Sequence, residues 1–339
     1  MTLPAGPWAT GVGSLPHSRP DEALDVVVGE LGDGHVPFVP ELPGRGVGSD
    51  VIGRGAAFLV DLPVDLQPAG WRLVDRPGAD LRRARSWWRQ DLDALGDRGP
   101  ELTGARALKV GVTGPWTLAA ALQRQRGEVA VSDPGARRDL VDSLAEGVGL
   151  VLADVRRAVP EVPLVLQVDE PSVVPVLLGR LPTASGYGTL RAVEGPEVRD
   201  GLRRVVDAGH TAGAAVVVHC CAAGAPVRLL GETRADGLSL PVPLSAAGAA
   251  GAVWEHVAGL VEAGTMLLAG VLDPTADVAP EPDALARDVQ RVWSDVGLAA
   301  DAQARLALTS TCGAAGTAPA AAVRQLRALA GAATRLATG

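Results

Sequence analysis

The sequence predicts an α/β fold, namely a (β/α)8 TIM barrel made by a single domain over residues 1–339. Eight short apolar or β-branched runs recur along the chain, and segments with apolar residues at helical spacing lie between them. Strands that alternate with helices predict a parallel sheet covered by helices on both faces, and eight such units predict a barrel. Chemically unusual side chains stand where the runs end, which is where such barrels carry their reactive groups.

The expected elements follow one another in order. Strands are expected over residues 9–14, 36–42, 107–114, 163–170, 213–221, 237–242, 265–273 and 306–313. Helices are expected over residues 20–31, 114–125, 136–158, 196–209, 249–264, 282–297 and 317–337. The stretch from about residue 50 to about residue 100 is longer than one connection requires. We therefore expect an insertion of helices or a hairpin between the second and third strands.

Composition and charge limit the function classes. The net charge of −8 and the lack of a Lys/Arg block argue against nucleic acid as the main partner. The first residues do not resemble a signal peptide, and no apolar run reaches the roughly 18–20 residues of a membrane span. We therefore expect a cytoplasmic protein with no membrane partner. Three cysteines in 339 residues do not predict a disulfide scaffold. A small-molecule substrate is the expected partner.

The basic residues are almost all arginines, and Lys109 is the only lysine. Gly, Ala, Pro and Arg are enriched together, which indicates a composition bias of the whole sequence. Single arginines therefore carry little information about chemistry.

The run VVVHCC places two of the three cysteines beside a histidine at the end of the fifth expected strand. Side chains alternate between the faces of a strand, so His219 and Cys221 are expected to share the barrel mouth, while Cys220 faces the helices. Cys312 ends the eighth run. Two cysteines and one histidine are a ligand set of catalytic zinc, with a fourth position left for water or substrate. The alternative is that these cysteines are ordinary buried residues.

Acidic and hydroxyl residues end other runs. Asp169 and Glu170 are expected to bind a substrate ammonium group, or alternatively to cap a helix. Ser14 either contacts substrate through its backbone or forms a turn. His17 is a candidate proton carrier, although a lone loop histidine commonly has no such role. Asp273 either orients His219 or begins the turn Asp-Pro-Thr.

Six segments resemble the C-terminal catalytic barrel of cobalamin-independent methionine synthase. They are GVGSLPH, GPWTL, QVDEP, VHCC, AGVLD and TCG, and they occur in a similar order and spacing. The resemblance implies that Gly13, Ser14 and Asp169 bind the amino-acid end of homocysteine. It implies further that His219, Cys221 and Cys312 hold Zn²⁺, and that the enzyme methylates the homocysteine thiol to give methionine.

The sequence departs from that family in its acidic residues. The family has a zinc-binding glutamate near the position of Leu240 and Pro241, where this chain has no acid, and Glu232 and Asp236 precede the end of that strand. A second family acid, which binds the substrate amine, has Glu41 or Asp50 as its candidate counterpart, and the simplest gapless count ends near Gly53.

The methyl donor is open. Full-length members of the family carry a second barrel that helps bind methyl-tetrahydrofolate, and this length leaves no room for one. The donor is therefore either a folate or a methyl-corrinoid protein.

Two other functions remain open at this point. The same fold family includes uroporphyrinogen decarboxylase, so one alternative is a metal-free decarboxylase of a porphyrin-like polycarboxylate. It would need arginines that face the mouth, for which Arg45 and Arg54 are the candidates, although neither ends an expected strand. The other is a non-catalytic protein that binds zinc, thiols or a corrinoid.

Overall fold

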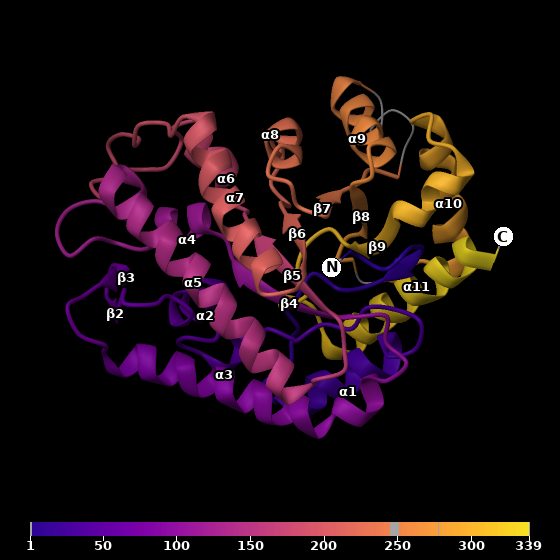
Figure 1. Ribbon diagram of the computed structural model, residues 1–339, viewed down its shortest axis with the longest axis horizontal. Coiled ribbons are helices and arrows are strands. Elements are labelled where there is room, and N and C mark those ends of the chain that lie inside the picture. The colour runs from indigo at the N-terminus through magenta and orange to yellow at the C-terminus, as the bar shows by residue number, and fades with distance from the viewer. Residues whose placement is uncertain (1, 245–250, 277, 339) are drawn as a thin grey trace.

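The computed structural model describes residues 2–244, 251–276 and 278–338, and its centre is a curled parallel sheet (Figure 1). Seven strands lie in the order β1-β9-β8-β7-β6-β5-β4, and every neighbouring pair is parallel. The strands are β1 Trp8–Ala9, β4 Leu108–Thr113, β5 Leu164–Asp169, β6 Ala215–His219, β7 Gly237–Pro241, β8 Met266–Leu272 and β9 Leu306–Ser310.

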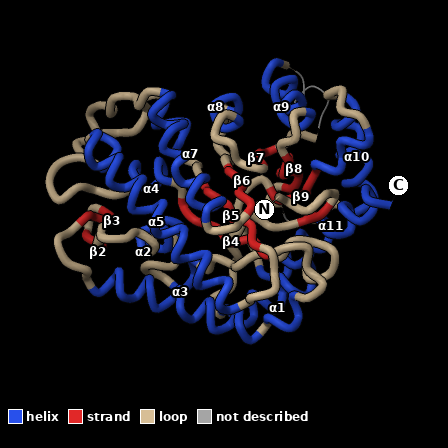
Figure 2. Tube along the Cα trace, in the orientation of Figure 1, coloured by secondary structure: helices blue, strands red, loops and turns tan. Residues whose placement is uncertain are grey.

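Helices surround the sheet, as the separation of central strands and outer helices in Figure 2 shows. They are α1 Pro20–Leu31, α2 Val51–Ala57, α3 Ala79–Asp97, α4 Pro115–Ala121, α5 Pro134–Ala158, α6 Val173–Leu177, α7 Gly195–Thr211, α8 Val227–Gly231, α9 Ala252–Glu262, α10 Pro282–Asp295 and α11 Pro319–Thr338. The short helices α6 and α8 were not expected. No helix of the described residues combines the length and the apolar character needed to cross a membrane.

Seven of the eight expected strands form, and the expectation of an eight-stranded barrel is wrong for residues 36–42. The described residues there form no strand. Pro37 and Pro40 provide the physical reason, because proline has no backbone N–H to donate to a neighbouring strand. The first expected strand is also shorter, with only Trp8 and Ala9 in regular pairing.

The segment 36–41 nevertheless bridges the two edges of the sheet. On the β1 side, Val36 N donates to Ala9 O (3.0 Å) and Glu41 N donates to Gly13 O (3.0 Å). On the β4 side, Lys109 N donates to the carbonyl of Pro37 (2.9 Å). The sheet is therefore curled and barrel-like, with an irregular segment in place of an eighth strand.

The expected insertion is confirmed, and it contains both helices and a hairpin. Between the segment 36–41 and β4 lie α2, the antiparallel strands β2 Val64–Gln67 and β3 Gly70–Leu73, and α3. Gly70 has a φ of +118° at the hairpin turn, a conformation that favours glycine.

The interior of the curled sheet has two layers. At the amino ends of the strands, an apolar cluster contains no helix residue: Trp8, Val36, Ala107, Val165, Val217, Met266, Leu268 and Ala307. Two residues further along the chain, on the same faces, stand Lys109, Gln167 and His219, all buried. The apolar layer thus closes one end of the interior, and polar chemistry is confined to the carboxyl end.

Candidate active site

Two carboxylates from different segments meet at Gly111 on β4. A Cβ placed on Gly111 would lie 3.3 Å from Asp169 Oδ2 and 3.4 Å from Glu41 Oε1, so the missing side chain leaves room for both groups. Burial raises the pKa of Glu41 to about 7, although Arg54 opposes the shift, and burial also raises the pKa of Asp169. Two buried carboxylates this close to each other are suited to bind a further cation such as an ammonium group, beside the cations Arg54 and Lys109 that already lie near them. Of the two candidates for the second acid, Glu41 is the one beside Asp169.

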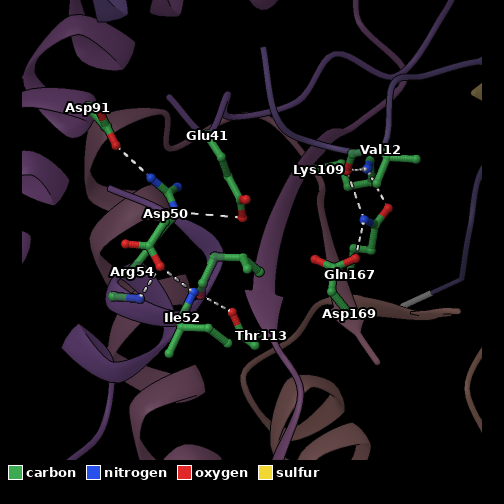
Figure 3. A network of polar contacts seen from close by, with 12 residues as sticks. Val12, Glu41, Asp50, Ile52, Arg54, Asp91, Lys109, Thr113, Gln167 and Asp169 are labelled. Atoms are coloured by element: carbon green, nitrogen blue, oxygen red, sulfur yellow. Dashed lines mark hydrogen bonds and ion pairs between the residues drawn. The ribbon is translucent and has the colours of Figure 1, made fainter. Parts of the chain in front are cut away.

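Asp50 has another role. Its carboxylate accepts hydrogen bonds from Ile52 N (3.1 Å) and Gly53 N (3.0 Å), and so caps the N-terminus of α2. Figure 3 shows Asp50 on the α2 side of the network that includes Glu41.

The two arginines considered for a decarboxylase are paired with one buried acid. Arg45 Nη1 lies 2.7 Å from Asp91 Oδ1, and Arg54 Nη1 lies 2.6 Å from Asp91 Oδ2. Arg54 Nε also lies 3.9 Å from Glu41 Oε1, and Figure 3 shows its guanidinium between the two acids. Their charges are therefore largely engaged within the protein, which disfavours a site for a polycarboxylate.

The first loop, residues 10–19 between β1 and α1, contacts the backbone of Glu41 and the last loop, residues 311–318 between β9 and α11. Leu15 N donates to Glu41 O (2.9 Å), and Ala314 N donates to Ser14 O (2.9 Å). Gly313 packs so closely on Ser14 that a Cβ there would overlap the Ser14 hydroxyl oxygen. The predicted substrate residues Gly13 and Ser14 are thus brought beside Glu41 and the loop of Cys312.

The predicted metal ligands also approach one another. Cys221 Sγ and Cys312 Sγ are 3.6 Å apart, a hydrogen-bond distance for thiols, although they are separated by 91 positions in the sequence. Interactions with Cys221 and then His219 lower the pKa of Cys312 to about 4, whereas the contact with Cys312 raises the pKa of Cys221. These shifts favour loss of a proton from Cys312 before Cys221. Cys220 is fully buried among the helix-facing apolar residues, as expected from strand alternation.

The imidazole of His219 is held at one nitrogen only. Nδ1 lies 3.0 Å from Ser239 Oγ on β7, while Nε2 is buried and makes no hydrogen bond of normal geometry. If Nδ1 donates to the serine, Nε2 carries the lone pair that a metal ligand needs. In the present conformation, no three His, Cys, Asp or Glu side chains among the described residues are arranged to hold a metal ion.

Glu170 is a helix cap. It is fully buried, and its two carboxylate oxygens accept hydrogen bonds from Trp116 N (2.9 Å), Thr117 N (2.9 Å) and the Thr117 hydroxyl (2.7 Å). These contacts satisfy the N-terminus of α4, and burial raises the pKa of Glu170 to about 8. The geometry favours the capping alternative over the predicted substrate contact.

His17 keeps one ring nitrogen without a partner, whereas the remaining candidate acids have other partners. Nδ1 of His17 is buried without a hydrogen-bond partner. Asp273 accepts hydrogen bonds from the backbone and hydroxyl of Thr275, so it forms the expected turn, and Ser239 is the partner of His219.

The two acids that precede the end of β7 have other partners. Asp236 binds His210 (2.8 Å), and Glu232 pairs with Arg199 (3.6 Å). Neither acid is free to complete a metal site.

Sequence reasoning assigned no role to three buried residues of this site, namely Lys109, Gln167 and Ser239. Lys109 donates to Val12 O (2.8 Å) and to Gln167 Oε1 (2.5 Å), and burial lowers its pKa to about 8. Its status as the only lysine and the position of Gln167 two residues before Asp169 are signals that were present in the sequence. The contact of Ser239 with His219 depends on the pairing of β6 with β7 and had no such signal.

The fold and these residues define an α/β, TIM-barrel-like protein with polar groups at the carboxyl ends of its strands. No family model matches the sequence, and no curated protein matches it. Among solved structures, a B12-independent methionine synthase from Shewanella sp. W3-18-1, in complex with selenomethionine, is similar with a TM-score of 0.61 and 14% identity over 99% of this chain and 98% of that chain. GH5_18 from Streptomyces cattleya, in complex with GlcNAc, aligns with a TM-score of 0.48 and 17% identity over 98% of this chain and 81% of that chain. At 14% identity, the likeness to the methionine synthase shows the fold alone.

Proposed function

We propose that this protein is a zinc-dependent methyltransferase that methylates a thiol, with homocysteine as acceptor and methionine as product. One observation carries the proposal: His219, Cys221 and Cys312 gather beside the carboxylate pair Glu41 and Asp169 at the carboxyl end of the sheet. The groups that would activate a substrate thiol and the carboxylates that would bind a substrate amino group then belong to one site. The fold likeness to a methionine synthase is consistent with this proposal.

The donor set suits a zinc ion with three protein ligands, although in the present conformation no three ligating side chains of the described residues are arranged around a metal position. The buried Nε2 of His219 has no hydrogen-bond partner, and the sulfur atoms of Cys221 and Cys312 lie 3.6 Å apart, so side-chain rotation would have to bring the three donors to one cation. Zinc would be held by His219, Cys221 and Cys312, and when bound it would lower the pKa of a coordinated substrate thiol so that the thiol reacts near neutral pH.

The protein's own groups orient the substrate. Glu41 and Asp169 would bind its ammonium group, and the backbone of Gly13 and Ser14 would contact its amino-acid end. Ser239 keeps the His219 ring in one orientation through Nδ1 (3.0 Å). His17, whose Nδ1 is buried without a partner, is the candidate to carry a proton away from the site.

The donor would be a methyl-folate or a methyl-corrinoid protein. The fold likeness spans 98% of the methionine synthase chain. No residue of this site distinguishes the two donors, and both are therefore included in the test.

The experiment measures zinc content and methyl transfer together. We expect about one zinc per chain in protein purified without added metal, and less than about a tenth of an equivalent in Cys221→Ser and Cys312→Ser. Cys220→Ser is the matched control, because Cys220 is buried on the opposite face, and it should keep the metal. Methyl transfer to homocysteine is then measured with methyl-tetrahydrofolate and with methylcobalamin.

Three results would contradict the proposal, and the first two would each favour a different function. A zinc-free wild-type protein that consumes a porphyrin polycarboxylate would be a decarboxylase. A zinc-loaded protein that methylates no thiol with either donor would be a non-catalytic zinc-binding protein. Equal zinc content in all three cysteine variants would show that these thiols are not ligands.

A further inference from the structure

We propose that Lys109 is a positioning residue of this site, which fastens the first loop to Gln167 and thereby fixes the carboxylate of Asp169 for a substrate ammonium group. The inference rests on the proposed function, because it concerns how the amino-acid acceptor is bound. Lys109 itself does not touch the reacting atoms.

The first argument comes from the use of basic residues. The chain has 31 lysines and arginines together, and Lys109 is the only lysine among them. Every other basic position is met by arginine, in line with the composition bias, yet this buried position holds lysine. An ammonium group is compact and can enter a site that is too small for the planar, five-donor guanidinium. The exception therefore marks a position with a specific requirement.

The second argument is a closed set of hydrogen bonds, visible in Figure 3. Lys109 Nζ donates to Val12 O (2.8 Å) and to Gln167 Oε1 (2.5 Å). Gln167 Nε2 donates to the same Val12 O (2.8 Å) and to Asp169 Oδ1 (2.8 Å). The loop that leads to Gly13 is thus tied through Lys109 and Gln167 to the carboxylate of Asp169.

The direction of these bonds follows from chemistry. A lysine ammonium group can only donate, so Gln167 must turn its amide oxygen toward Lys109 and its NH₂ group toward Asp169. That occupies Oδ1 of Asp169 and leaves Oδ2, the oxygen nearest Gly111, beside Glu41 Oε1. Without a donor at position 109, the amide oxygen of Gln167 would lose its hydrogen bond, and only the contacts of its NH₂ group with Val12 O and Asp169 Oδ1 would hold the side chain.

The burial of Lys109 argues against a role for this side chain as mere filling of the protein interior. Lys109 is 1% exposed and stands directly above the apolar layer, so its charge costs free energy that a leucine or methionine would not. The positive charge lies near both Glu41 and Asp169 and partly balances them, and the ring of Phe38 lies 5.6 Å from Nζ. A cation that is expensive to bury is thus placed where it acts on the two carboxylates.

The test compares binding of methionine with binding of its analogue that lacks the amino group, by calorimetry. Lys109→Met and Gln167→Met keep the approximate size of the side chain and remove the donor or the relay. We expect each to weaken methionine binding at least about tenfold, and to change binding of the analogue less than about twofold. The double variant should be no weaker than the weaker single variant, because both residues act through one chain of contacts.

Gln325→Met is the matched control. Gln325 on α11 is also buried and hydrogen-bonded, to Pro274 O (3.0 Å), but lies outside the proposed site, so the preference for methionine should be unchanged. If Lys109→Met fails to fold, Gln167→Met still provides the test, because it places no charge and removes none.

The outcomes separate this inference from the proposed function. Wild-type protein that prefers methionine, together with folded Lys109→Met and Gln167→Met variants that keep the full preference, would overturn the positioning role alone. Wild-type protein that binds neither methionine nor homocysteine would overturn the proposed function, and this inference with it.

Discussion

The three cysteines of this chain lie in three different environments, and their reactivity should differ accordingly. Cys312 is exposed and its pKa is lowered to about 4, whereas Cys220 is fully buried and burial raises its pKa to about 11. In metal-free protein near pH 6, iodoacetamide should therefore modify Cys312 first and leave Cys220 unmodified, because the thiolate is the nucleophile. Mass spectrometry of the alkylated peptides measures the order.

The variant Cys221→Ala tests the cause of this difference. The contact with Cys221 contributes most to the low pKa of Cys312. Its removal should raise the pKa of Cys312 and so slow the alkylation of Cys312 near pH 6, by about tenfold for each unit by which the new pKa exceeds the pH, because the thiolate is the reactive form. An unchanged rate would show that the neighbouring thiol does not stabilise the thiolate.

Glu170 should contribute to stability through the N-terminus of α4. In Glu170→Gln, the amide NH₂ group would face one of three hydrogen-bond donors, so we expect a loss of about 1–3 kcal/mol in the free energy of unfolding. Urea denaturation measures the loss. Glu161→Gln, at an exposed position, should change the free energy of unfolding by less than about 0.5 kcal/mol.

The same variant carries a prediction about pH. Because burial raises the pKa of Glu170 from 4.5 to about 8, the folded protein keeps a proton that the unfolded chain has lost between these values. The wild-type free energy of unfolding should therefore fall as pH rises through this window, and Glu170→Gln should lack this contribution. The stability difference between the two proteins should shrink from pH 5 to about pH 8; a constant difference would contradict the raised pKa.

At the scale of elements, helix α5 contains two glycines with opposite requirements. A Cβ on Gly147 would overlap the carbonyl oxygen of Phe58, whereas Gly149 has no atom within 4 Å of its Cβ position. We expect Gly147→Ala to cost about 1–3 kcal/mol through displacement of the backbone after α2. Gly149→Ala should stabilise the protein by up to about 1 kcal/mol through helix propensity. Chemical denaturation of both variants measures the contrast, and equal effects would show that α5 does not pack closely on this backbone.

Element prediction from the sequence succeeded where the pattern was long and regular. The expected strands at residues 107–114, 163–170 and 306–313 form within a few residues of their predicted bounds. The run 36–42 has the same apolar character, but its prolines prevent regular pairing. The short helices α6 and α8 escaped prediction because a few residues contain too little periodicity to be recognised.

At the scale of the whole molecule, the proposed zinc site would connect strands that are not neighbours. His219 ends β6 and Cys312 follows β9, and β7 and β8 lie between these strands in the sheet. Zinc bound to the folded state alone should raise the free energy of unfolding by about 2.7 kcal/mol at a metal concentration one hundred times the dissociation constant. Thermal denaturation with zinc and with a chelator measures this shift, which Cys312→Ser should abolish.

Amide hydrogen exchange measures which elements the bound zinc would stabilise. Zinc should slow exchange in β6 and β9 and leave the hairpin β2–β3 unchanged, because only the former elements would carry ligands. Uniform protection of both regions would indicate binding elsewhere.

Local sequence by itself determined the alternation of strands and helices, the ends of most strands, and the opposite facing of Cys220 and Cys221, because these depend on periods of 2 and 3.6 residues along the chain. The tertiary structure alone decided that Glu41 meets Asp169 at Gly111, that Glu170 caps α4, and that Lys109 ties Gln167 to the first loop. Those contacts join segments tens of residues apart. Their geometry depends on the curvature of the sheet and on glycines such as Gly111, which leave room for the side chains of other segments. No local sequence pattern encodes either feature.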